Sequence, residues 1–265
     1  MLIAGFPAGA FAANCYVVAP GPGEQCLIVD PGQDAEPGIE EIIQRYRLQP
    51  AAVLLTHGHI DHIWSVVPVC GAKNIPAYIH PADRALLSDP ASGLWPQAGS
   101  ALLNGLTFTE PDEVAELADG ATLQLAGVEV VVDHAPGHTP GAVTFRLPGA
   151  SGTWASGMRA SGTRAGQPGD GEPGDGEPED GEPGDGDQPV LFSGDLLFAG
   201  SIGRTDLPGG DYATIMDSIA RVCLPLPDET VVLAGHGPQT TIGAERAANR
   251  FLAGLAPAPG PARGL

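Results

Sequence analysis

The sequence predicts an α/β protein in which two β-sheets pack against each other and helices cover the outside. Short apolar, strand-like runs fall into two series along the chain, and helical patterns follow the runs of each series. With 265 residues, of which 43% are hydrophobic, the chain has enough apolar side chains for a substantial core. Two series of strands followed by helices are typical of layered α/β architectures.

The first series begins at the N-terminus. Strands are expected at 1–6, 12–18 and 25–30, a helix at 36–47 and a buried strand at 51–55. The helix is predicted because Ile39, Ile42 and Ile43 recur at helical spacing, with acidic residues early and arginines late, as the helix dipole favours. A second helix is expected to begin at Asp61, an N-cap type of residue, and Pro68 is expected to shorten or kink it.

The second series follows a poorly patterned stretch. A strand at 76–80 and a short helix from Pro81 precede this stretch, which extends to about residue 118. Beyond it we expect strands at 122–126, 128–134, 142–147 and 190–193, a helix at 211–222, a strand at 230–234 and a helix at about 241–252.

Residues 151–189 interrupt the second series. They contain nine Asp or Glu, two Arg and the near-repeat GDGEPGDGEPEDGEPGDGD. Glycine and proline resist regular structure and the like charges repel, so we expect a disordered acidic insertion. A calcium-binding repeat would need regularly placed apolar residues, which this segment lacks. The prediction is one domain over 1–252 that contains this insertion, with a flexible tail at 253–265.

Charge and cysteine usage restrict the function. The net charge of -20 disfavours nucleic acid or an anionic membrane surface as a partner, because both would repel the chain. A small soluble substrate is therefore expected. The four cysteines are scattered without a CxxC motif, and no Lys or Arg precedes Arg45 to form the charged start of a signal peptide, so a cytoplasmic location is expected. No uninterrupted apolar run is long enough to span a membrane.

The sequence THGHIDH at 56–62 combines three histidines and one aspartate directly after the strand at 51–55. His57 and His59 are expected in the loop after the strand, and Asp61 and His62 in the first turn of the next helix, so the four side chains can converge. A single histidine would more often make a private hydrogen bond, but three within six residues favour a metal site. Imidazole nitrogen and carboxylate oxygen suit zinc, iron or manganese.

Three further segments deliver a metal-binding type of residue beside glycine. VVVDHAPGHTPG carries His138, VLFSGD carries Asp195 and VVLAGHGP carries His236. With the first cluster they make seven candidate ligands, too many for one ion and suitable for two. Asp195 is the natural bridge, because a carboxylate has two oxygens to share.

These residues resemble the metallo-beta-lactamase superfamily, whose HxHxDH motif corresponds to His57, His59, Asp61 and His62. FSGDLLFAGSIGRTDLPGGD and GHGPQTTIGAERAANRFL are similar to the glyoxalase II group of hydroxyacylglutathione hydrolases, particularly its short bacterial members. The resemblance implies a four-layered αβ/βα sandwich. It also implies two divalent ions, with zinc expected and iron or manganese as alternatives: one ion held by His57, His59 and His138, the other by Asp61, His62 and His236, with Asp195 bridging them.

The implied reaction is hydrolysis of a small-thiol thioester such as S-lactoylglutathione by a hydroxide held between the two ions, which Asp61 could orient. Arg204 could bind a substrate carboxylate, or could instead pair with Asp206 or Asp211. Asp206 would repel a carboxylate, which disfavours glutathione as the thiol.

The sequence leaves two other functions open. A persulfide dioxygenase using one iron is the alternative enzyme, and a non-catalytic metal-binding protein is the alternative of another class; a true β-lactamase is disfavoured. Thr56 and Asp30 are expected to orient the ligands, and His80 and His134 are expected to be structural or to support the ligands rather than bind metal. The sequence does not predict an oligomeric state.

Overall fold

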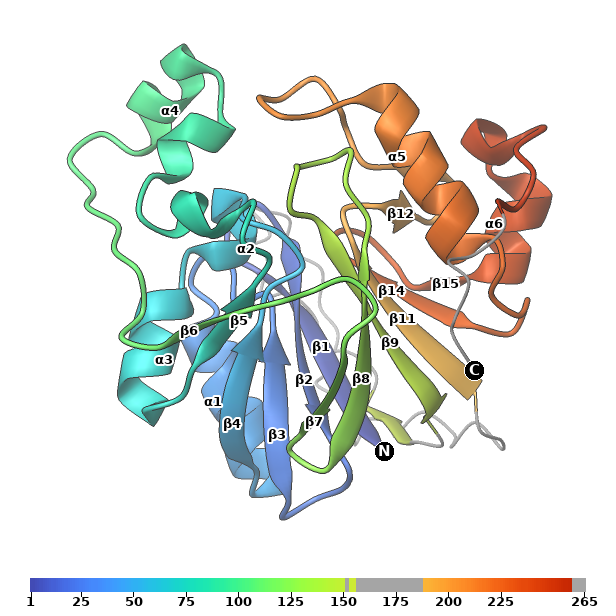
Figure 1. The fold of residues 1–265 in the computed structure, drawn as a ribbon. Coiled ribbons are helices and arrows are strands. Elements are labelled where there is room, and N and C mark those ends of the chain that lie inside the picture. Colours follow the sequence, from blue (N-terminus) through green and yellow to red (C-terminus); the bar gives the residue numbers. More distant parts are fainter. Residues whose placement is uncertain (151–152, 156–187, 259–265) are drawn as a thin grey trace, which may run out of the picture.

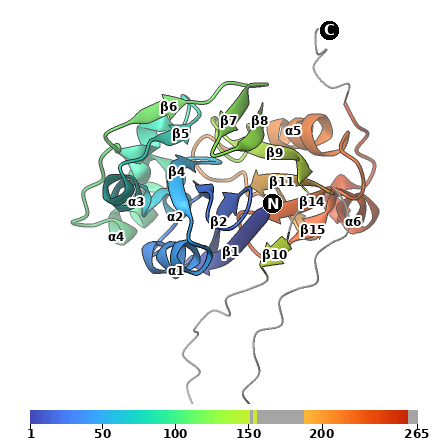
Figure 2. The same ribbon diagram turned by 90° about the horizontal axis from the view of Figure 1, so that it is seen from below.

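The computed structural model describes residues 1–150, 153–155 and 188–258. Its two large sheets lie face to face with helices outside (Figures 1 and 2). The first sheet has the order β10 (Thr153–Ala155), β1 (Leu2–Ala8), β2 (Ala13–Ala19), β3 (Gln25–Val29), β4 (Gln49–Leu54), β5 (Ala77–Ile79) and β6 (Val114–Glu116). The second has the order β15 (Thr240–Thr241), β14 (Val231–Ala234), β11 (Gln188–Gly194), β9 (Val143–Ala150), β8 (Val128–His134) and β7 (Thr122–Leu125). A small pair joins β12 (Leu197–Phe198) and β13 (Ser201–Ile202).

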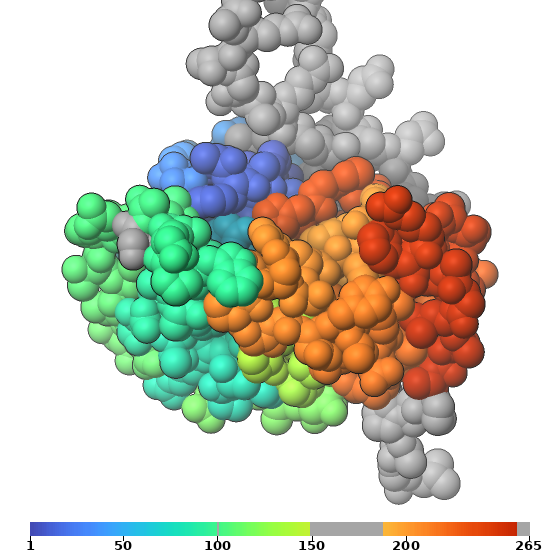
Figure 3. Space-filling model, turned by 90° about the horizontal axis from the view of Figure 1, so that it is seen from above, coloured from blue at the N-terminus to red at the C-terminus, as the bar shows by residue number. Residues whose placement is uncertain are grey.

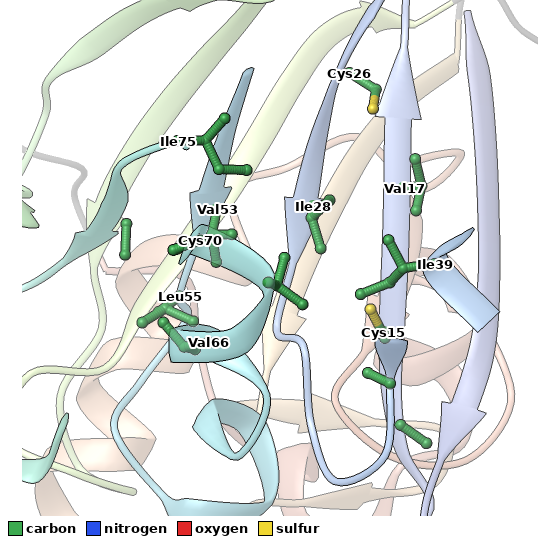
Figure 4. Packing of buried hydrophobic residues seen from close by; sticks show 14 of the residues in the cluster. Cys15, Val17, Cys26, Ile28, Ile39, Val53, Leu55, Val66, Cys70 and Ile75 are labelled. Carbon is green, nitrogen blue, oxygen red and sulfur yellow. The ribbon is translucent and has the colours of Figure 1, made fainter. Parts of the chain in front are cut away.

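Alternating burial along the strands creates the four layers. In β3, Leu27 and Val29 belong to the core between the sheets, whereas Cys26 and Ile28 belong to the core under the helices. Figure 4 shows this helix-facing core, to which Ile28 of β3 and Ile39 of a covering helix both belong. A third core, on the outer face of the second sheet, completes a helix–sheet–sheet–helix arrangement. The predicted αβ/βα sandwich is confirmed.

The helices cover the outer faces and connect the strands. They are α1 (Glu36–Tyr46), α2 (Ile60–Ile63), α3 (Val66–Lys73), α4 (Pro96–Leu102), α5 (Tyr212–Ser218) and α6 (Ile242–Ala248). Short helical turns are η1 (Arg84–Leu87), η2 (Pro90–Gly93), η3 (Ile219–Cys223) and η4 (Arg250–Leu252). None of the helices in the described ranges is both long and apolar enough to cross a bilayer.

The helix predicted from Asp61 begins at another residue in the structure and is interrupted at another position. The N-cap is His59, so the prediction of Asp61 as the first residue was wrong, and Asp61 lies in the first turn of α2. The break falls at Trp64 and Ser65 instead of at Pro68. Pro68 is accommodated because it occupies the first turn of α3, where a backbone N–H has no partner within the helix.

Several boundaries also moved. The helix expected at 211–222 is α5 followed by the π-type turn η3, and the last helix ends at Ala248 because Asn249 begins a 3-10 turn. β6 lies in the poorly patterned stretch before residue 118, where no strand was predicted. Two parts of the expected insertion at 151–189 are strands: β10, which pairs in parallel with β1, and the first residues of β11. Its remainder, and the end of the predicted tail, lie outside the described residues.

The strand directions bring the candidate site together at one end of the sandwich. β3 and β4 are parallel in the first sheet, and β11 and β14 are parallel in the second. The chain leaves these four strands at Asp30, Leu55, Asp195 and Gly235. Residues from both sheets therefore meet where the strands end, as ligand sites of α/β proteins commonly do.

Candidate metal centre

The first group of donors contains His57, His59 and His138, whose ligand-type atoms lie within 4.8 Å of one another. His57 and His59 come from the loop between β4 and α2, and His138 from the loop after β8. His59 turns Nδ1 towards Nε2 of His138 at 2.8 Å. All three side chains are buried. The structure thus joins two loops that lie about 80 residues apart in sequence.

The second group contains Asp61, His62 and His236, again within 4.8 Å. Nε2 of His236 lies 3.1 Å from Oδ2 of Asp61. Asp195 lies between the two groups: its Oδ1 is 3.4 Å from Nε2 of His62, and its Oδ2 is 3.5 Å from Nε2 of His138. The structure therefore brings all seven predicted site residues together, with Asp195 in the position expected of a bridge.

Several buried polar atoms of this donor set have no hydrogen-bond partner, which shows whether the set fits metal ions. Nε2 of His57, Nε2 of His62 and Oδ1 of Asp195 are buried and have no hydrogen-bond partner. Leaving such polar atoms unpaired away from water is costly, so they indicate that a cation is their natural partner. Imidazole and carboxylate donors suit divalent transition metals. The residues present fit two such ions.

Hydrogen bonds set the orientation of the imidazoles. Nδ1 of His62 donates to Oδ2 of Asp30 at 3.0 Å, and Nδ1 of His138 donates to the carbonyl oxygen of Arg204 at 2.7 Å. Nδ1 of His57 contacts the hydroxyl of Thr56 at 3.1 Å, and that hydroxyl donates to Oδ2 of Asp30 at 2.6 Å. In the neutral form, each ring with its Nδ1 proton held in this way has the Nε2 lone pair free, which is the tautomer that binds metal.

Asp83 supports the site and was missed by the sequence analysis. Its side chain is buried and accepts hydrogen bonds from the N–H of Gly58 at 2.9 Å, the hydroxyl of Thr139 at 2.6 Å and the N–H of Gly141 at 2.7 Å. Asp83 thereby links the loop of His57 and His59 to the loop of His138. The only local signal was an acidic residue at the start of a short helical turn, which is too common to indicate a buried role.

The loop of His236 is held by side chains of β2, a strand inside the first sheet. The side-chain amide of Asn14 donates to the carbonyl oxygens of Ala234 and Gly237, and the hydroxyl of Tyr16 donates to that of Ala234 at 2.7 Å. Both side chains come from β2. Hydrogen bonds across the sandwich therefore fix His236 relative to the donors of the first sheet.

The electrostatics of the site keep two imidazoles neutral. Burial and the neighbouring histidines hold the pKa of His57 well below its usual value, and burial with His138 lowers the pKa of His59 to about 3. Burial opposes charge on both His62 and Asp195. The carboxylates of Asp61 and Asp195 nevertheless raise the pKa of His62, and His62 in turn lowers the pKa of Asp195. Neutral imidazoles beside ionised carboxylates are the forms that bind a cation.

A family model described as the metallo-beta-lactamase superfamily matches residues 8–151 and 177–236. The chain belongs to the metallo-beta-lactamase superfamily. Among curated relatives, an uncharacterized protein of Mycobacterium tuberculosis is 46% identical over 96% of this chain and 99% of its own length. The hydroxyacylglutathione hydrolase GloC of Haemophilus influenzae is 31% identical over 93% of this chain and 95% of its own.

Two solved structures are also similar to this chain. The B3 metallo-beta-lactamase BLEG-1 has a TM-score of 0.72 and 36% identity over 95% of this chain and all of its own. TTHA1623 in a di-iron-bound form has a TM-score of 0.64 and 34% identity over 93% of this chain and 98% of its own. The chain is thus a metal-dependent hydrolase of the superfamily, and the di-iron neighbour allows iron as well as zinc.

A cavity of about 450 Å³ opens onto the donors of this metallo-hydrolase. His59, Asp61, His138, Asp195 and His236 are among its lining residues. Apolar side chains form much of its walls: Phe11, Leu94, Leu102, Phe198, Ile202 and Leu207. A substrate placed here would meet the metal-binding atoms at one end and hydrocarbon around them.

Arg204, the predicted substrate contact, also lines this cavity but is already paired. Its guanidinium donates to both carboxylate oxygens of Asp206 at 2.7 Å, and both side chains are more than half exposed. The ion pair lowers the pKa of Asp206 to about 2. Arg204 therefore forms the ion pair with Asp206 that was the predicted alternative to substrate binding.

His80 and His134 lie apart from the donors. Their rings stack at 4.1 Å between centroids and 5° between planes, and Nε2 of His134 donates to the carbonyl oxygen of Pro140 at 2.9 Å. Neither belongs to a metal-binding group. The pair joins the residue that follows β5 to the last residue of β8, in keeping with the structural role expected of these residues.

Proposed function

We propose that this chain hydrolyses a small-thiol thioester, as a glyoxalase II-type enzyme, with two divalent ions. The observation that carries the proposal is the complete set of seven donors, in two groups that share Asp195, beside a cavity lined with apolar residues. The identity to GloC over almost the whole of both chains favours the thioester as substrate.

Each group has a defined part in the proposed reaction. His57, His59 and His138 would hold one ion, Asp61, His62 and His236 the other, and Asp195 both. Bound ions of this kind supply a hydroxide near neutral pH and polarise a carbonyl oxygen. Asp61, exposed to the cavity beside His236, can orient the attacking oxygen. A thioester needs little general-acid help because a thiolate is a good leaving group.

The protein's outer contacts would keep this arrangement fixed during the reaction. Asp30 and Asp83 hold the loops of His57, His62 and His138 without entering the cavity themselves. Such contacts remove the freedom of the ligands, so that little reorganisation is needed when charge develops on the substrate.

Hydrolysis of a β-lactam ring is a second candidate, favoured by the 36% identity to BLEG-1. A thioester and a β-lactam both contain an activated or strained carbonyl group that the same metal centre could attack. Assays must therefore include a β-lactam beside the thioesters.

The test is elemental analysis of the purified protein together with turnover of S-lactoylglutathione, a neutral acyl thioester and a chromogenic cephalosporin. Two metal ions per chain and turnover of a thioester are expected, with Asp195→Ala losing both metal and turnover. One iron per chain with uptake of oxygen would instead identify the dioxygenase alternative. Turnover of the cephalosporin alone would identify the second candidate.

A further inference from the structure

A second cavity adjoins the first at Leu94. It encloses about 800 Å³, and Leu94 lines both cavities. Its apolar lining includes Leu94, Trp95, Leu103, Leu106, Phe108 and Pro208. Pro208 follows Leu207, which lines the first cavity, so the two cavities adjoin on both sides.

Exposed apolar side chains concentrate beside this second cavity. Of the five large hydrophobic side chains that are exposed among the described residues, three lie in one short segment: Trp95 at 51%, Leu102 at 38% and Leu106 at 49%. Figure 3 shows this face, where the green residues around α4 lie beside the orange residues that follow β11. Clustered exposed hydrocarbon usually marks a binding surface.

The charges around both cavities disfavour an anionic ligand. Apart from the metal-binding residues, the only charged side chain that lines the first cavity is Arg204, and Asp206 neutralises it. The only charged side chain that lines the second is Asp89. A carboxylate extending from the metal centre would find no free cation among these lining residues.

We propose that the substrate carries an uncharged apolar acyl chain, which runs from the metal centre past Leu94 into the cavity beside Trp95. This inference rests on the proposed thioester hydrolysis and names its substrate class. Burial of the chain against Leu103, Leu106 and Phe108 would supply the binding free energy that a charged clamp supplies elsewhere. The thiol part would then leave through the mouth of the first cavity.

The test uses neutral N-acetylcysteamine thioesters with acyl chains of two to eight carbons. The value of kcat/KM should rise with chain length, by up to about fourfold for each methylene that becomes buried. Trp95→Ala should lower the ratio of kcat/KM for octanoyl over acetyl by about tenfold. Val67→Ala is the matched control, because Val67 is an exposed apolar residue on α3 that lines neither cavity.

A binding measurement separates this inference from the proposed function. Calorimetry with N-acetyl-S-alkylcysteamine thioethers, which cannot be hydrolysed, should show affinity that increases with chain length and decreases in Trp95→Ala. Such binding without turnover of any thioester would support the apolar site and overturn the proposed reaction. Thioester turnover without chain-length dependence, or with S-lactoylglutathione preferred over the octanoyl thioester, would overturn the inference and leave the reaction standing.

Discussion

Asp83 shows how one buried carboxylate can hold a metal site that it does not enter. Its two oxygens accept three hydrogen bonds from two loops, and each loop carries a histidine of the first donor group. Hydrogen bonds to a charged, buried acceptor are among the stronger ones in proteins. The position of His138 relative to His57 therefore depends on Asp83 as well as on the strands.

Replacing Asp83 by Asn keeps the volume but puts an amide group where two acceptor oxygens are needed. We expect the free energy of unfolding to fall by about 2–3 kcal/mol and the affinity for metal to fall about 10–100-fold. Urea denaturation of the metal-free protein and competition with a chelator measure the two effects. Asp217→Asn, at an exposed position on α5, is the control and should change neither. Unaltered metal affinity in Asp83→Asn would contradict the linking role.

At the scale of elements, glycines decide how closely the loops approach. A Cβ atom on Gly235, just after β14, would lie 2.2 Å from Oδ1 of Asp195 and 2.8 Å from Cε1 of His62. A Cβ atom on Gly71, within α3, would meet no atom within 4 Å. The same substitution should therefore have opposite effects at the two positions.

Gly71→Ala should stabilise the protein by about 0.5–1 kcal/mol, because alanine loses less conformational entropy in a helix. Gly235→Ala should destabilise it by about 1–3 kcal/mol through overpacking and should reduce the bound metal. Urea denaturation and metal analysis of both variants provide the measurement. Full metal content and unchanged stability in Gly235→Ala would contradict the close approach of Gly235 to Asp195 and His62.

The elements also show what the sequence could predict and why. Strands such as β3, β4 and β11 have uninterrupted apolar runs, so both their place and the donors that follow them were predictable. β6 has only one strongly apolar residue, Val114, and β10 lies in a segment dominated by Gly and acidic residues. These short strands form because a neighbouring strand offers backbone partners, which is information that local periodicity does not contain.

The same limit applied to the site. All seven donors follow predicted strands or begin a helix directly after one, so their convergence was expected. Asp83 contacts glycine N–H groups that no side-chain pattern reveals, and the pairing of Arg204 with Asp206 left two interpretations open until the distance was known. Contacts to backbone and choices between partners depend on tertiary structure.

For the whole molecule, buried thiols couple stability to alkaline pH. All four cysteines are buried and free, and burial raises the pKa of Cys26, Cys70 and Cys223 to about 12, from an ordinary value of 9.0. In the unfolded chain these thiols ionise near pH 9, whereas in the folded chain they stay protonated. The stabilisation is therefore complete below pH 9 and is lost as the pH rises towards 12.

We expect the free energy of unfolding to decline as the pH is raised from 9 to 11. Cys70→Ala should make this decline shallower by about 1 kcal/mol per pH unit, since one raised pKa is removed. Urea denaturation at closely spaced pH values tests this expectation. An equal slope in the variant and the parent protein would show that Cys70 does not contribute.

The register of the second sheet places the segment between β9 and β11 away from the seven donors. Gln188 pairs with Ala150 at the end of β11 farthest from Asp195. A fluorescent reporter or an affinity domain could be inserted into the chain at this end of the sheet. Its two ends would then be attached at neighbouring points of the sandwich. An insertion between β9 and β11 would thus leave the candidate metal centre undisturbed.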